Sequence, residues 1–204
     1  MTCMSKLTML LCVPLLAVFS MAQQEKEKTP EFPSTEEIDL AVTQSERSFE
    51  QYKQAVTMEA DLPSSKQNPS VIEKDRNVYD MATKLIAAMK VHPQSFHGLG
   101  GLLLLSSLDD ASRNALVCSS SAYSDAMTEL MTASDSHTAI ASAKDWIQVG
   151  LSCIDVSGHL YTVSESVHAL LVREMEAQQL LNQSAEQTLN QCTAALKKCD
   201  SRSK

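Results

Sequence analysis

The stretch LYTVSESVHALLVREMEAQQLLNQSAEQTLNQCTAAL, residues 160–196, decides the fold class of this chain. Its apolar side chains recur at the spacings of a single helix face rather than with the alternation of a strand. They are Leu160, Val163, Val167, Leu170, Leu181, Ala185 and Leu196. At 1.5 Å per residue this helix is roughly 55 Å long, so the core of a bundle is not expected to cover all of it. The Asn- and Gln-rich segment 182–191 should project or bend away.

Two helices are expected in the N-terminal half. Residues 34–37, Ser-Thr-Glu-Glu, have the S-x-x-E form of a capping box at a helix start. The apolar face that follows is Ile38, Val42, Phe49, Tyr52 and Val56. After a loop over 60–69, Asn68 and Pro69 resemble an N-cap with proline in the first turn, and Pro93 should end the second helix. Its expected face is Ile72, Val78, Ala82, Leu85 and Met89.

Two further helices are expected between residues 107 and 157. The four leucines 102–105 form either a short buried helix or the end of a loop tucked into the core. Residues 107–110, Ser-Leu-Asp-Asp, place acids in a first turn, where the helix dipole favours them. The two expected faces are Leu108, Ala115, Ala122, Ala126 and Leu130, then Ile140, Ile147, Leu151 and Ile154. Trp146 is expected in the core, and Ser157-Gly158 should break the chain before the long helix.

These segments predict an all-α protein. Glycine is rare, with 5 in 204 residues, and Ala, Leu, Ser, Gln and Glu dominate, which favours helix over sheet. Short connections keep consecutive helices antiparallel. We expect a single domain over 34–199, an antiparallel helical bundle of four to five helices with a long C-terminal helix. Residues 200–204 are expected to be a disordered tail.

The first 22 residues have the layout of a secretory signal peptide. Lys6 is their one charge, an apolar run spans 7–19, and Ser20 and Ala22 are small residues before the expected cut. The run of about 13 residues is shorter than the roughly 20 of a spanning helix. We therefore expect a secreted or periplasmic protein with no membrane span after cleavage. The polar segment 23–33 is expected to be a disordered leader.

The charge and motif content exclude several classes of function. Residues 23–204 carry 16 basic and 25 acidic residues, a net charge of −9, so nucleic acid is not an expected partner. The sequence contains no serine-nucleophile, dinucleotide-binding or haem-attachment motif. Glu165 and His168 form a single E-x-x-H, whereas di-iron bundles use two. We expect no enzymatic activity, no cofactor and no metal.

Four cysteines follow the signal segment: Cys118, Cys153, Cys192 and Cys199. An even number in an exported chain predicts disulfides, and four cysteines allow three pairings. A bridge between Cys118 and Cys153 could staple neighbouring helices. In an unbroken helix the Cα atoms of Cys192 and Cys199 would be roughly 10 Å apart, beyond the limit of about 7 Å, so these two pair only if the helix ends between them.

One part of the chain resembles a known family. The residues concerned are Ala115-Leu116, Cys118, Tyr123, Asp125-Ala126, Leu130, Trp146 and Cys153-Ile154-Asp155. Over 115–155, about 40 of the 182 residues after the signal, they resemble the plant invertase and pectin methylesterase inhibitors, which are secreted four-helix bundles with disulfides. The resemblance implies a Cys118–Cys153 bridge and inhibition of a cell-wall enzyme by docking. The family's N-terminal cysteine pair is absent, because no cysteine lies within 23–117, and the last helix is longer than the family needs.

The sequence therefore predicts a non-enzymatic, exported binding or structural protein. The alternative is a secreted inhibitor of a cell-wall carbohydrate-active enzyme, and an alternative of another class is a metal-binding bundle. A protein partner is expected at the C-terminal helix, where Ala185, Leu189, Cys192 and Leu196 lie on or near one face.

Overall fold

The computed structural model describes residues 30–62, 69–132 and 136–202, and within these ranges every regular element is helical. The elements are α2 (Thr35–Ala60), α3 (Pro69–Val91), the 3₁₀ helix η1 (Pro93–Phe96), α4 (Leu99–Thr132) and α5 (Ser136–Arg202). The predicted all-α fold with a long C-terminal helix is confirmed. No helix in the described ranges has both the length and the apolar character needed to cross a bilayer. The expected signal segment 1–22 lies outside the described residues.

The chain divides into two units. One unit is Glu31–Gln179 and contains the helical bundle. The other comprises 1–30 and 180–204, of which the structure describes Pro30 and the part of α5 from Leu180 to Arg202. The helix therefore includes residues 200–202, which were expected in the tail. Of the expected leader, only 30–33 is described, and Pro33 within it is buried.

The start of α2 confirms the capping box. The backbone N–H of Glu37 donates to Ser34 Oγ over 3.3 Å, and the Ser34 N–H donates to Glu37 Oε2 over 2.8 Å. Together these bonds satisfy two donors that a helix start would otherwise leave unpaired. The same Glu37 carboxylate accepts two hydrogen bonds from Arg173 of α5, of 2.8 and 2.7 Å, and so ties the start of α2 to α5.

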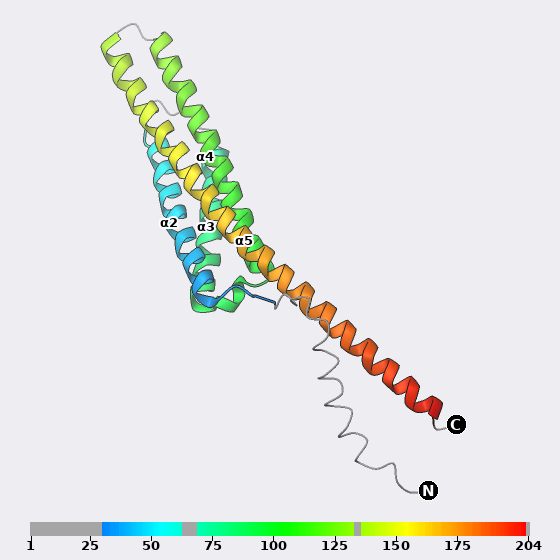
Figure 1. Ribbon diagram of the computed structural model, residues 1–204. Helices are drawn as coiled ribbons and strands as arrows, with labels where there is room; N and C mark the ends of the chain where they lie inside the picture. Colours follow the sequence, from blue (N-terminus) through cyan, green and yellow to red (C-terminus); the bar gives the residue numbers. More distant parts are fainter. Residues whose placement is uncertain (1–29, 63–68, 133–135, 203–204) are drawn as a thin grey trace. The chain divides into compact units, whose positions relative to one another are not determined.

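Four helices build the bundle of the first unit. In Figure 1, α2, α3, α4 and the first part of α5 lie side by side, and α4 and α5 extend beyond α2 and α3 at the end where they are connected. At 1.5 Å per residue α4 is about 51 Å long, against about 39 Å for α2 and about 35 Å for α3. The largest fully buried side chains are Trp146, Tyr52, Phe49, Phe96, Met89, Leu104, Leu108 and Leu160. Among the described helices, α4 and α5 alone reach this end of the hairpin.

The expected helix start at residues 107–110 is wrong, because α4 begins at Leu99. Gly98, with a φ of 65°, makes the turn, a conformation that favours glycine. Gly100 and Gly101 belong to the helix. A Cβ at Gly100 would lie 1.8 Å from the Ser95 carbonyl oxygen, and a Cβ at Gly101 would lie 2.6 Å from the Phe96 carbonyl oxygen. These glycines permit close packing against η1. The four leucines lie inside α4, with Leu104 fully buried.

The expected break at Ser157-Gly158 is also wrong, since α5 runs unbroken through both residues. A glycine inside a helix costs only about 1 kcal/mol relative to alanine, which packing on either side of it readily offsets. Ser157 is buried, and its hydroxyl donates to the Ser112 carbonyl of α4 over 2.9 Å. The described α-helices therefore number four, because the helices expected at 140–154 and 160–196 form one helix.

The face expected for residues 140–154 is wrong as well. Ile140, Ile147, Leu151 and Ile154 are exposed, as is Leu130 of α4. The buried residues of this part of α5 are instead Ala139, Ala143, Trp146, Val149, Cys153 and Val156. Opposite them α4 buries Ala111, Ala115, Ala122 and Ala126. The alanines of α4 leave room for Trp146 and the valines of α5, so this stripe of α5 faces α4 and the isoleucines and Leu151 remain outside.

Candidate functional site

The register of α4 and α5 is fixed by a disulfide and by polar contacts. Cys118 and Cys153 are bonded, with their Cα atoms 6.1 Å apart, so the predicted bridge is confirmed. On one side of the disulfide, Ser112 and Ser157 exchange hydrogen bonds. On its other side, the Tyr123 ring lies against Gly150, where a Cβ would be 3.2 Å from the ring. Closing this loop of 35 residues should stabilise the fold by roughly 3–4 kcal/mol in the chain-entropy model.

The C-terminal cysteines are not bonded to each other. Cys192 is a free, exposed cysteine. The condition for a Cys192–Cys199 bond, a helix end between the two residues, is not met, because α5 continues to Arg202. Cys199 lies in the helix, and its side chain is outside the described part of the structure. The sequence left the pairing of Cys192 open, and within the described residues Cys192 is not part of a disulfide.

The histidines and acids considered in the sequence are not brought together. Glu165 and His168 are both exposed. His159 Nδ1 lies 3.1 Å from Gln51 Oε1, and His97 Nδ1 lies 3.3 Å from Glu174 Oε1. Across 30–62, 69–132 and 136–202, no group of three or more His, Cys, Asp or Glu side chains is arranged to hold a metal ion.

A buried polar contact joins α2, α3 and α4. The Tyr52 hydroxyl donates to Asp75 Oδ1 over 2.8 Å, and Asn114 Nδ2 donates to the Tyr52 oxygen over 3.4 Å. Burial raises the pKa of the Asp75 carboxyl, and burial together with the Asp75 charge raises the pKa of the Tyr52 hydroxyl. Asp75 was not among the residues predicted from the sequence, although its position three residues before Val78 and seven before Ala82 places it on the buried face of α3.

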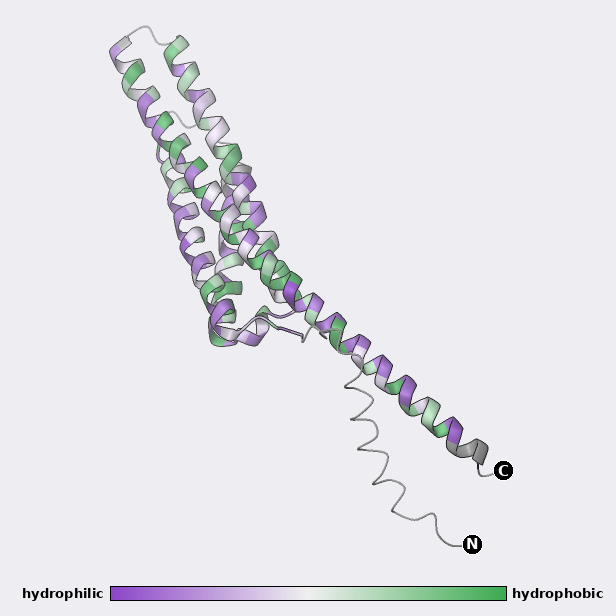
Figure 2. Cartoon of the chain, viewed as in Figure 1, coloured by the Kyte–Doolittle hydropathy of each residue, from purple (hydrophilic) through white to green (hydrophobic). Residues whose placement is uncertain are grey.

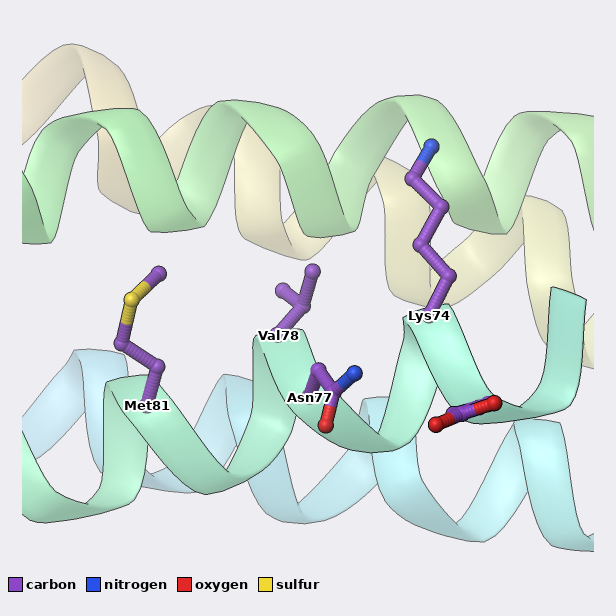
Figure 3. Close-up of a pocket in the computed structure, with 5 residues that line it drawn as sticks. Lys74, Asn77, Val78 and Met81 are labelled. Carbon is purple, nitrogen blue, oxygen red and sulfur yellow. The ribbon is translucent and has the colours of Figure 1, made fainter. Parts of the chain in front are cut away.

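Two cavities are lined by residues of α3, and the first of them adjoins this contact. One, of about 430 Å³, lies between α2 and α3 and is lined by Tyr52, Lys53, Val56, Thr57, Ala60, Asp61, Asp75, Arg76, Tyr79 and Asp80. The other, of about 330 Å³, lies on α3, and Figure 3 shows Lys74, Val78 and Met81 of its lining directed toward α4. The Lys74 ammonium donates to Asn114 Oδ1 over 3.3 Å. In both cavities the hydrogen-bonded polar groups connect neighbouring helices. Tyr52 and Asp75 join α2 to α3, and Lys74 and Asn114 join α3 to α4.

The exposed apolar side chains of the hairpin form the largest candidate site. Four follow helical steps along α4 and five along α5, and Figure 2 shows hydrophobic segments recurring along both helices. We call them the outer apolar face: Leu116, Tyr123, Met127, Leu130, Ile140, Ile147, Leu151, Ile154 and Tyr161. Tyr123 lies against Gly150, the residue before Leu151, so the two stripes meet there. The register set by the disulfide also brings Leu116 level with Ile154.

The area of this face is that of a protein interface. Its nine side chains are 36% to 62% exposed. At about 100 Å² each they expose roughly 900 Å², whereas the largest apolar patch on a typical monomer is about 300–600 Å². A standard interface takes about 800 Å² from each partner.

Gly158 lies on the same side of α5 as this face, four residues after Ile154 and three before Tyr161. No atom of the described chain lies within ordinary contact distance of a Cβ built there, and its φ is not positive. The other four glycines are explained by close packing or, at Gly98, by backbone conformation. The packing of the described residues therefore does not require glycine at 158.

Comparison with protein-family models, curated proteins and solved structures gives no match to this chain.

Proposed function

We propose that this chain is a non-enzymatic, exported protein that binds a folded protein through the outer apolar face of its α4–α5 hairpin. The observation that carries the proposal is the roughly 900 Å² of exposed apolar side chain on one face, the area of one side of a standard interface. The partner's matching surface should be apolar and similar in area. The Cys118–Cys153 bridge suits an oxidising compartment outside the cytoplasm, either secreted or periplasmic.

A second candidate function is inhibition of a cell-wall carbohydrate-active enzyme. It is favoured by the positions of the residues that resemble the plant inhibitor family. Leu116, Tyr123, Leu130 and Ile154 all belong to the outer apolar face. In this version the same face docks on the enzyme, and the chain supplies no catalytic group.

Site-specific photo-cross-linking tests the leading proposal. A photoreactive residue at position 151, on the outer apolar face, should capture a protein from the exported fraction of the producing cells. The same residue at position 87, which is exposed on α3, should not. Adding Ile147→Glu should abolish capture at 151, because a buried unpaired charge opposes docking. Equal capture at both positions, no capture, or capture of a second copy alone would overturn the proposed partner class.

Enzyme assays test the second candidate. The purified chain should inhibit a pectin methylesterase or an invertase at a stoichiometric ratio, and Ile147→Glu should relieve the inhibition. Unchanged activity of both enzymes at a large excess of the chain would reject this candidate and leave the leading proposal standing.

A further inference from the structure

The last part of α5 is a helix whose side chains are all exposed. Residues 181–198 are helical throughout, and each of them is exposed. Leu189 and Leu196 are 67% and 68% exposed. An isolated helix of this length is marginal in water, even with good helix formers. A second helix packed against Leu189, Cys192 and Leu196 would supply the packing that stabilises most helices in proteins.

The sequence of this segment has the three- and four-residue spacing of a coiled-coil seam over about two and a half heptads. Residues spaced alternately by three and four form one seam. The a positions are Asn182, Leu189 and Leu196, and the d positions are Ala185, Cys192 and Cys199. The outward b, c and f positions are polar with one exception: Gln183, Ser184, Gln187, Asn190, Gln191, Ala194, Lys197 and Lys198. The apolar seam is thus narrow and continuous, as pairing with one other helix requires.

Two further features specify a parallel pair of identical helices. Asn at an a position is the residue that fixes register and two-stranded pairing in parallel coiled coils, and Asn182 occupies one. Among the e and g positions within 182–199, Glu186 is the one charged residue, and it would face leucine or threonine of a second copy. Pairing of like chains therefore meets no like-charge repulsion at these positions.

The cysteines support the same arrangement. Within one helix their Cα atoms are roughly 10 Å apart and cannot be bridged. In a parallel, in-register pair each d residue faces its own counterpart, so Cys192 faces Cys192 of the second copy. The free, exposed thiol of Cys192 thereby gains a bonding partner that its own chain does not provide.

We infer that residues 182–199 pair with the same segment of a second copy of this chain as a short parallel coiled coil, closed by a Cys192–Cys192 disulfide. This inference is independent of the proposed function of the hairpin. A low-molecular-weight disulfide such as oxidised glutathione supplies the oxidising equivalents. One Cys192 thiolate attacks it and releases one glutathione thiolate. The second Cys192 thiolate then attacks the resulting mixed disulfide at the protein sulfur, which releases the other, so two protein thiols become one S–S bond.

The test uses the full chain with Cys199→Ser, at low micromolar concentration in a glutathione redox buffer. We expect a covalent dimer on non-reducing gels and a Cys192–Cys192 peptide pair by mass spectrometry. Adding Leu189→Glu, at an a position, should slow dimer formation about tenfold, the effect of losing about 1.4 kcal/mol of association free energy. The matched control Gln187→Glu adds the same charge at an outward f position and should change the rate less than about twofold.

Several outcomes would overturn the inference. One is a monomer carrying glutathione on Cys192, and another is the same rate for Leu189→Glu and Gln187→Glu, which would indicate random collision. In the chain with both cysteines, a predominant Cys192–Cys199 pair between chains would indicate antiparallel packing. Because residues 187 and 189 are exposed, the helical signal and melting temperature of each variant check that the bundle is unchanged.

Discussion

Along residues 111–130 of α4, the inner and outer faces of the hairpin differ in the size of their side chains more than in their apolar character. The inner face of α4 is rich in alanine, with Ala111, Ala115, Ala122 and Ala126 buried. The outer face carries Leu116, Tyr123, Met127 and Leu130, all exposed. Both follow helical spacing. On α4 the alanine stripe is the buried one, and the close approach that it permits gains packing contacts for every residue.

The largest expected effect compares two adjacent residues of α5. Trp146 is 1% exposed and Ile147 is 39% exposed. Trp146→Ala should lower the free energy of unfolding by about 3–5 kcal/mol, because it leaves a cavity in the core. Ile147→Ala should cost less than about 1 kcal/mol. Urea unfolding followed by circular dichroism measures both, and equal losses would contradict the division into inner and outer faces.

The second effect concerns the bridge on the inner side of the hairpin. Replacing both Cys118 and Cys153 by alanine should lower the free energy of unfolding by about 2–4 kcal/mol, since the unfolded chain gains conformational freedom. The non-reduced wild type is the reference, and reduction of the wild type should reproduce the loss. A double variant as stable as the oxidised protein would mean that the bridge contributes nothing to the fold.

A smaller effect separates the two glycines of α5. Gly158→Ala should raise the free energy of unfolding by about 0.5–1 kcal/mol, because alanine favours the helix and the site is open. Gly150→Ala should give no such gain, since its Cβ would lie 3.2 Å from the Tyr123 ring. If both variants were stabilised equally, Tyr123 would not be held against α5 and the outer apolar face would be discontinuous.

The smallest effect contrasts the carboxyl of Glu37, which is partly exposed, with that of Asp75, which is buried. Hydrogen bonds from Arg173 and Ser34 lower the pKa of Glu37 to about 2, so its contribution to stability is present above its ordinary pKa near 4.5 and is lost as the pH falls toward 2. Burial raises the pKa of Asp75, so stability instead increases as the pH falls through that raised pKa toward its ordinary value.

Melting temperatures between pH 7 and pH 2 test this contrast. Glu37→Gln should flatten the acid limb of the profile below about pH 4.5, and Asp75→Asn should flatten the part above it. A Glu37→Gln profile that still falls as steeply as that of the wild type would show that the Glu37–Arg173 pair does not contribute.

Local signals in the sequence predicted much of the bundle. The capping box at Ser34 and the end of α3 before Pro93 depend on neighbouring residues, and both are confirmed. Pairing of Cys118 with Cys153, which the family resemblance implied, is also confirmed. A helix break was predicted at Ser157-Gly158. The helix continues there because the free-energy cost of one glycine, about 1 kcal/mol, is smaller than the stabilisation from the packed residues on either side.

The candidate site could not be found in the same way. Ile147, Leu151 and Ile154 were assigned to the core because they are large and periodic, which is the usual rule for one apolar stripe. Which of two stripes is buried depends on the partner helix, and that information lies in the alanines of α4, 21 to 43 residues earlier in the sequence. Binding through the C-terminal helix stays a prediction.

The bond between Cys118 and Cys153 also determines how the chain responds to force. A load applied at the two ends passes through the S–S bond and bypasses the 35-residue loop that it closes. About 120 Å of extended chain is therefore withheld from stretching until the bond is reduced. Reduction of the bond would lengthen the chain by that amount under an unchanged load. The part of the hairpin between the two cysteines, which carries six of the nine residues of the outer apolar face, is thus protected from tension that unfolds the rest of the bundle.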